Sequence, residues 1–402
     1  MNELSQPVLG ILTLYLNEKK HLEERPIYQR MIAASHKLGM QTFVFTPQDV
    51  DSNKKQIYGM FYNPKSRTWT REWTSFPHLI FDRCRIQNTY RFKELLKFRA
   101  RYNALHFLNR PLRNKWTIHQ VLCNHPIIKP HLPFTKLYSS ANDVHLLMKK
   151  ERLVFLKPIN GTGGRGILRI ERLAGAKRYD IQGRDHRRQI ISPQRIQPSL
   201  LASKLSSWNA KDRYILQQGI AIKLPNGRVH DYRLLVQKDG SGEWTVTGCA
   251  GRVGPLRSVT SNLHGGGEAV PMMKLLNEWI EDPEKIKMVK EKMETLGIET
   301  AKFLEEKYGA LCELALDIAI DRSGHVWLLE VNPKPAREVF AKAGEKDTYN
   351  LAIIKPIEYA YFVYNTKLKV KSRSKAREKI RKKQSRVTAF DTLLNLEDIK
   401  NL

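Results

Sequence analysis

The chain has 402 residues, 41% of them hydrophobic, and a formal net charge of +29. This length allows two or three domains, the hydrophobic content excludes a disordered chain, and the charge predicts an anionic partner. Four scattered cysteines without a C-x-x-C pair argue against a zinc site or a disulfide framework and favour a reducing compartment. No apolar run is long enough for a membrane span, so we expect a soluble, cytoplasmic protein.

The first part of the chain, residues 1–110, predicts a small α/β domain. A strand, a helix and a second strand follow one another, which favours parallel pairing of the two strands, and Gly39 ends the helix. The expected elements are a strand at 8–16, a helix within 21–38, a strand at 41–46, a β-hairpin at 58–73 and a strand at 78–83.

A glycine-rich stretch, "FLKPINGTGGRGILRI" at 155–170, suggests a phosphate-binding loop. Its letters match G-x-G-x-x-G, but the apolar residues after it predict a strand rather than the helix that a dinucleotide site needs. The P-loop ending Gly-Lys-Ser/Thr is missing, and no protein-kinase signature follows. We therefore predict a glycine hairpin, in which two strands joined by a flexible loop fold over a nucleotide. An ordinary glycine-rich hairpin remains the alternative.

Further elements are expected before and after the glycine hairpin. A helix is expected from Leu112 and, after the hairpin, a polar and basic insertion that runs to about Asp212. Further elements are a strand at 214–220, a β-hairpin across 229–254, a helix at 283–307 and two strands at 311–321 and 325–332. The tail from Lys367 to Arg386 holds a single acid, and we expect it to contact something anionic.

The last two strands carry the residues that suggest metal chemistry. If they form a hairpin turning at Ser323-Gly324, Asp317 lies opposite Glu330, and Asn332 points to the same face two residues further on. Carboxylate and amide oxygens suit Mg²⁺, which binds few protein ligands and completes its shell with phosphate oxygens. A pair of salt-bridged acids is the alternative interpretation.

Taken in order, the motifs resemble the ATP-grasp superfamily. They are the lysine before the glycine hairpin, "HDYRLLV", "SNLHGGG", "LALDIAID" and "LLEVN", and the similarity covers about 112–356. The narrower similarity is to the YheC/YheD endospore coat-associated family. This resemblance implies an α/β (α+β) ATP-grasp fold with an N-terminal α/β pre-ATP-grasp domain. The domains would span 1–110 (N-terminal), 111–216 (central), 217–366 (C-terminal, with the Mg²⁺ site) and 367–402 (basic tail).

The resemblance also implies a role for each candidate residue. Arg233 and Arg252 would face the γ-phosphate and an acyl phosphate, while Asn262 and His264 would line the site near the phosphate or the acceptor. The metal ligands would be Asp317, Glu330 and Asn332. The ATP-binding residues would be Lys115, Lys157, Gly161, Gly163, Gly164, Gly166, the linker Gln217, Gln218 and Ile220, and the ribose-binding Asp231. Many members of the superfamily carry an acid at the linker, where this chain has Gln217 and Gln218.

These roles predict an ATP-dependent ligase with ATP and Mg²⁺ as cofactors. A carboxylate would attack the γ-phosphate, and an amine would then displace phosphate from the acyl phosphate. The identities of both substrates stay open. The alternative function is an ATP-binding, non-catalytic scaffold of the spore coat. The partner of the basic tail would be an anionic polymer or a spore-coat component. A nucleic-acid binder ranks third, because no recognition motif accompanies the charge.

Overall fold

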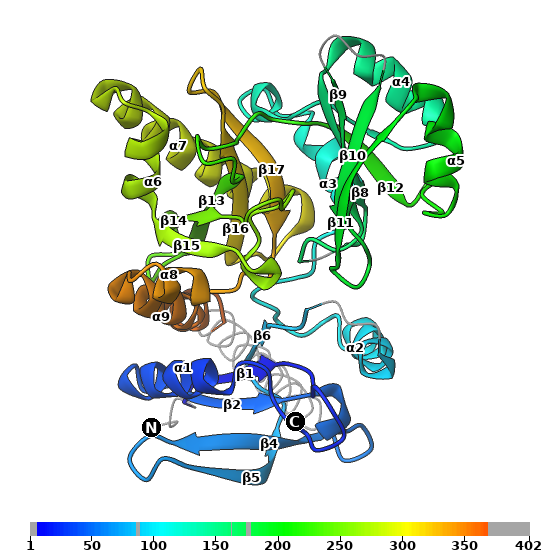
Figure 1. The fold of residues 1–402 in the computed structure, drawn as a ribbon. Helices are drawn as coiled ribbons and strands as arrows, with labels where there is room; N and C mark the ends of the chain where they lie inside the picture. Colours follow the sequence, from blue (N-terminus) through cyan, green and yellow to red (C-terminus); the bar gives the residue numbers. More distant parts are fainter. Residues whose placement is uncertain (1–5, 86–88, 162, 174–177, 369–402) are drawn as a thin grey trace, which may run out of the picture.

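The computed structural model describes residues 6–85, 89–161, 163–173 and 178–368. Within these residues the strands form three sheets, which Figure 1 shows as separate units. The expected basic tail, 367–402, lies outside the described residues from 369 onward, so its role stays a prediction. The domain bounds expected from the sequence likewise stay a prediction.

The N-terminal sheet confirms the expected α/β start of the chain. Strand β1 lies between β2 and β6 and is parallel to both, and α1 connects β1 to β2. Helix α1 ends two residues before Gly39, whose φ of 69° is a conformation that glycine adopts without strain. The strands are β1 (Val8–Leu12), β2 (Gln41–Phe45), β3 (Val50–Asp51), β4 (Gln56–Asn63), β5 (Thr68–Ser75) and β6 (Leu79–Asp82).

The central sheet contains the predicted glycine hairpin, formed by antiparallel β8 and β9. The sheet order is β11-β10-β9-β8-β12-β7. Its strands are β7 (Thr135–Leu137), β8 (Leu153–Pro158), β9 (Ile167–Arg172), β10 (Tyr179–Arg184), β11 (Ile190–Ile196) and β12 (Tyr214–Gln218). The prediction of a polar insertion up to Asp212 is wrong. Strand β10 pairs along the whole of β9, and its buried side chains complete the core beneath the hairpin.

The C-terminal sheet is antiparallel, in the order β15-β14-β13-β16-β17. Every residue of β16 is buried, which explains why its sequence is apolar apart from Glu313 and Asp317. The long helix α7 covers one face of the sheet. The strands are β13 (His230–Lys238), β14 (Trp244–Val253), β15 (Glu268–Pro271), β16 (Glu313–Ile320) and β17 (Val326–Asn332).

Helix α9, near the C-terminal end of the described residues, packs against the first strand of the chain. Its apolar residues, including Ile353 and Ile357, pack in one core with Leu9 and Ile11 of β1. The helices are α1 (Arg25–Lys37), α2 (Tyr90–Arg101), α3 (Lys115–Leu122), α4 (Ala141–Lys150), α5 (Leu201–Ser206), α6 (Met272–Trp279), α7 (Pro283–Tyr308), α8 (Glu338–Lys342) and α9 (Lys346–Val363). In Figure 1, α8 and α9 lie between the N-terminal and C-terminal sheets.

A buried ionic network joins these two sheets. Arg83, which follows β6, forms ion pairs with Glu24 at 2.8 Å and with Glu313 of β16 at 2.5 Å. Arg337 forms a further ion pair with Glu313, and its Nε donates to the carbonyl of Ala352 in α9. Buried charges are costly to separate from their partners, so the network holds the N-terminal sheet at a defined position against β16.

Two sequence expectations about cysteines and membranes can be compared with the structure. All four cysteines are free thiols, as expected from their spacing. In the described part of the chain, the helices lack the combination of length and apolar character that a membrane crossing requires.

Candidate functional site

One face of the C-terminal sheet carries five charged residues of the prediction. Register pairs Asp231 of β13 with Arg252 of β14, and Arg233 of β13 with Asp317 of β16. Asp317 in turn pairs with Glu330 of β17. Since side chains alternate along a strand and directly paired residues share a face, all five project from the same side of the sheet.

The predicted pairing of Asp317 with Glu330 is confirmed, although the turn is displaced by one residue. Ile318 pairs with Leu328, whereas Asp317 pairs with Glu330, so Leu329 is an extra residue on β17. This bulge restores the register that the displaced turn would otherwise have changed. Asn332 then pairs with Ala315, two positions further along the same face.

The arginines and aspartates of this face form a continuous chain of ion pairs. Arg252 donates two hydrogen bonds to Asp231, from Nε at 2.7 Å and from Nη2 at 2.6 Å. The same Nη2 lies 3.1 Å from Asp317 Oδ2. Arg233 Nε lies 2.6 Å from Asp317 Oδ1. Both oxygens of Asp231 are thus occupied by Arg252, and the ribose role expected for Asp231 stays a prediction.

The electrostatics of this cluster follow from burial and from these contacts. Burial alone would raise the pKa of Asp317, but Arg233 and Arg252 outweigh it and hold that pKa below its usual value. The pKa of Arg252 is raised, because Asp231 and Asp317 overcome the effect of its burial. Burial lowers the pKa of Arg233, with repulsion from Arg252 in the same direction. Asp317 is therefore an ionised acid.

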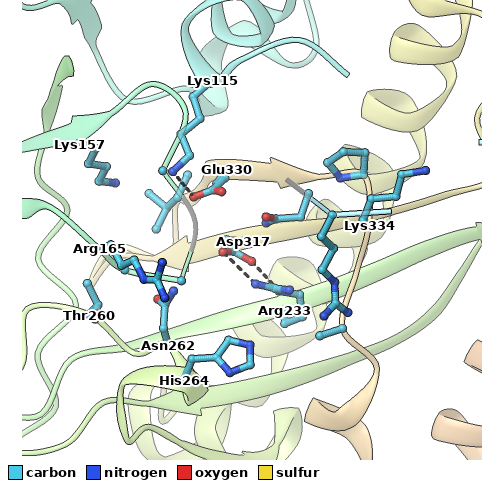
Figure 2. A pocket seen from close by; sticks show the side chains of 18 of the residues that line it. Lys115, Lys157, Arg165, Arg233, Thr260, Asn262, His264, Asp317, Glu330 and Lys334 are labelled. Carbon is cyan, nitrogen blue, oxygen red and sulfur yellow. Dashed lines mark hydrogen bonds and ion pairs between the residues drawn. The ribbon is translucent and has the colours of Figure 1, made fainter. Parts of the chain in front are cut away.

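Two lysines approach this face from the central part of the chain. Lys115, the first residue of α3, lies 3.2 Å from Glu330. Lys157 of β8 donates a 2.6 Å hydrogen bond to the side-chain carbonyl of Gln217 on β12. Burial and the neighbouring Lys115 lower the pKa of Lys157 to about 8. Figure 2 shows both lysines on one side of the pocket, across from Asp317 and Arg233.

The predicted linker residues have different surroundings. Gln217 is buried, and its amide nitrogen donates to Thr135 Oγ1 while its oxygen accepts from Lys157. Its side chain therefore positions the lysine. Gln218 accepts a hydrogen bond from the backbone of Phe134. Gln217, Gln218 and Ile220 all line the same cavity, and their contact with adenine stays a prediction.

The "SNLHGGG" motif lies in the segment 254–267, between β14 and β15. Asn262 and His264 line the cavity, and Figure 2 shows both below Arg165 and Thr260. Partial burial of the His264 ring lowers its pKa, and the nearby charges of Arg188 and Arg85 act in the same direction. A neutral ring favours hydrogen bonding over charge compensation at this position.

All of these groups surround one cavity of about 1170 Å³. Its walls come from the central sheet, the C-terminal sheet, and the loops and helix α2 that follow the N-terminal strands. Every predicted site residue except Gly166 lines it. Gly166 has a φ of 65° and lies against Tyr214 and His186 instead. Within the glycine loop, Gly163 and Gly164 also have positive φ, which supports the prediction of a loop that depends on glycine.

Several lining residues were missed by sequence reasoning. Arg165 lies inside the glycine loop, Thr260 just precedes "SNLHGGG", and Arg188 belongs to the supposed insertion. The N-terminal wall, with Arg85 and Phe92, carried no motif at all. Only Arg165 had a usable signal, since it is a cation within a phosphate-loop pattern.

The cluster can be tested for its fit to a metal ion. Asp317 and Glu330 provide carboxylates, and the buried side-chain nitrogen of Asn332 lacks a hydrogen-bond partner, so that amide is free to rotate its oxygen toward a cation. The described residues contain no group of three or more His, Cys, Asp or Glu placed to hold a metal. Two carboxylates and an amide fit Mg²⁺ when a ligand supplies the remaining oxygens.

Comparison with solved structures defines the class of the fold. The crystal structure of D-cycloserine synthetase DcsG superposes with a TM-score of 0.50 and 13% sequence identity, covering 89% of this chain and 99% of that chain. The chain thus has the ATP-grasp fold, an α/β arrangement, as expected.

The narrower relationship is visible in the sequence. Residues 104–363 match the YheC/D like ATP-grasp family, and the chain belongs to that family. The endospore coat-associated protein YheC of Bacillus subtilis (strain 168) is 28% identical over 337 residues, covering 80% of this chain and 89% of YheC. The endospore coat-associated protein YheD of the same strain is 24% identical over 365 residues, covering 89% of this chain and 79% of YheD.

Proposed function

We propose that the chain binds Mg-ATP in this cavity and uses it to join a carboxylate to an amine. One observation carries the proposal. A sheet face with two arginines and three acids lies across a cavity from a glycine hairpin and two lysines. Phosphate oxygens require cations and backbone N–H groups, whereas Mg²⁺ requires carboxylates, and this cavity offers both.

The nucleotide would lie between the central and C-terminal sheets. Lys157 and Lys115 would contact its phosphates, and the glycine hairpin would cover them with backbone N–H groups. Gln217 supports this assignment, because its bond to Lys157 directs a cation with a lowered pKa into the cavity. The adenine would meet the linker that ends β12.

Asp317, Glu330 and Asn332 would hold Mg²⁺, which would neutralise phosphate charge. In this structure the positive charges of Arg233 and Arg252 balance the charge of Asp317, and the charge of Lys115 balances that of Glu330. These cations are also the groups that phosphate would attract. Binding of the metal to the acids and of the phosphates to the cations would therefore replace internal ion pairs without leaving a buried charge unpaired.

The reaction would proceed in two displacements. A carboxylate oxygen of the first substrate attacks the γ-phosphorus, the bond to the β–γ bridging oxygen breaks, and ADP leaves with that electron pair. The amine nitrogen of the second substrate then attacks the acyl carbon, phosphate leaves, and the amine loses a proton. Arg233 and Arg252 are held rigidly and would stabilise the charge that develops on the transferred phosphoryl oxygens.

The first experiment is calorimetric titration with ATP in the presence and absence of Mg²⁺. We expect binding that depends on Mg²⁺ and that weakens in Glu330→Gln, because this change removes one metal ligand. Glu291→Gln is the matched control, since Glu291 lies exposed on α7. No binding at millimolar ATP would refute the proposal. Release of ADP during a screen of carboxylates and amines would then test ligation.

A scaffold that binds ATP without catalysis is the second candidate function. It is supported by the relatives, which are named endospore coat-associated proteins, and by the basic tail. We propose that association with an anionic coat component would depend on residues 369–402. Loss of coat association on deletion of the tail, with nucleotide binding unchanged, would separate the two functions.

A further inference from the structure

Arg184, the last residue of β10, connects the central sheet to the C-terminal sheet. Its Nη2 donates to the backbone carbonyl of Gly265 at 2.7 Å and to Ser258 Oγ at 3.2 Å. Both acceptors belong to the segment 254–267, which is more than seventy residues away in the sequence. In Figure 1, β10 belongs to the unit at the upper right, apart from the sheet that contains β14 and β15.

The surroundings of Arg184 are shaped for this contact. The residue is 4% exposed, and no ion pair is found for it in the described part of the chain. A Cβ atom added to Gly265 would lie 2.6 Å from Arg184 Nη1, so an alanine at this position would displace the guanidinium from its present place. Burying an arginine without an acidic partner costs free energy, and the two hydrogen bonds of Arg184 offset part of that cost.

The segment held by Arg184 forms part of the cavity wall. Thr260 and Asn262 line the cavity, and a Cβ on Gly164 of the glycine hairpin would lie 3.4 Å from Thr260 Oγ1 and 3.6 Å from Asn262 Nδ2. The hairpin and the segment therefore meet over the cavity. The hydrogen bonds of Arg184 connect β10 of the central sheet to the segment 254–267 beside this approach.

We propose that Arg184 is a positioning residue that links the glycine hairpin to the placement of Asn262 and His264, and so helps to retain the nucleotide. The contact fixes the segment 254–267 relative to β10, and β10 pairs with β9, the second strand of the hairpin. The position of the hairpin is thereby linked to the position of Asn262 and His264. The coupling rests on the proposed binding of Mg-ATP, whereas the contact itself does not.

The test compares Arg184→Met with Arg187→Met, which removes the same charge from an exposed side chain three residues away. Hydrogen exchange without nucleotide would be followed at the amides of Gly265, Gly266 and Gly267, which bond within the segment. Dissociation of the non-hydrolysable analogue Mg-AMPPNP would be measured by stopped flow. Arg184→Lys, which keeps the charge but not the planar fork, should give an intermediate result.

We expect exchange at these amides and the dissociation rate each to rise roughly tenfold in Arg184→Met, equivalent to about 1.4 kcal/mol, and to stay unchanged in Arg187→Met. Gly265→Ala should reproduce the effect while keeping the arginine, and it replaces Arg184→Met if that variant does not fold. Unchanged exchange would overturn the contact, and raised exchange with unchanged dissociation would overturn the coupling. A wild-type protein that fails to bind Mg-AMPPNP would refute the proposed function, while exchange would still decide whether Arg184 holds the segment.

Discussion

Replacing Arg252 by methionine tests the ion-pair chain of the C-terminal sheet without any assumption about ligands. The guanidinium is buried and contacts both Asp231 and Asp317. Methionine fills similar volume but offers neither charge nor donors. Asp231 would lose its partner for both oxygens, and Asp317 would keep only Arg233. Two carboxylates would then remain on an apolar sheet with one cation between them.

The expected loss of stability follows from this geometry. Removing one partner of a buried ion pair typically costs about 3–5 kcal/mol, because the other charge stays buried without compensation. For a unit of about 150–250 residues, each kcal/mol lowers the melting temperature by roughly 2–4 °C. We therefore expect Arg252→Met to melt about 10 °C below the wild type. Arg252→Lys should lie between them, since it keeps the charge but loses the two-pronged bond to Asp231.

Differential scanning fluorimetry of the purified variants measures this effect. Lys274→Met serves as the control, because Lys274 lies exposed on α6 of the same unit and should change the melting temperature little. Adding Asp231→Asn to Arg252→Met should recover part of the loss, since it removes the charge left behind. If Arg252→Met melts within about 2 °C of Lys274→Met, the claim that this cluster is buried and coupled is wrong.

Three further predictions concern the central sheet. Lys157 is cationic below its pKa of about 8 and neutral above it, so affinity for Mg-ATP should fall between pH 7 and pH 9 in calorimetry, whereas Lys157→Arg should remove this dependence. Gln217→Leu deletes the acceptor that orients Lys157 and should weaken ATP binding roughly tenfold, the cost of a hydrogen bond to a charged group, with unchanged circular dichroism. Gly183→Ala would place a Cβ atom 2.1 Å from the carbonyl oxygen of Ile167 and should therefore lower the melting temperature. Gly240→Ala is the control, because its Cβ would lie 3.5 Å from the nearest atom and should leave the melting temperature unchanged. Equal melting temperatures of the two variants would contradict the close approach of β10 to β9.

Much of the site could be predicted because its signals are local. The glycine hairpin follows from a loop between two apolar runs, and the pairing of Asp317 with Glu330 follows from two strands joined by a short turn. Such patterns depend on periodicity and turn chemistry, which a few neighbouring residues express. The YheC/D like ATP-grasp family was recognisable for the same reason, since its motifs occur in order along the chain.

Other features depended on contacts between distant segments. Polar and basic residues made β10 and β11 look like an insertion, although β10 pairs with β9 and β11 pairs with β10 in the central sheet. The bulge at Leu329, the use of Gln217 to orient Lys157 and the packing of α9 against β1 have no local signature.

The sequence by itself determined which chemical groups the protein carries and which strands adjoin them, because strand and turn preferences act over a few residues. The tertiary structure alone decided which groups share a cavity. Ion pairs among β13, β14 and β16, and the pair between Lys115 of α3 and Glu330 of β17, join segments that lie far apart in the sequence, and no local pattern encodes their proximity.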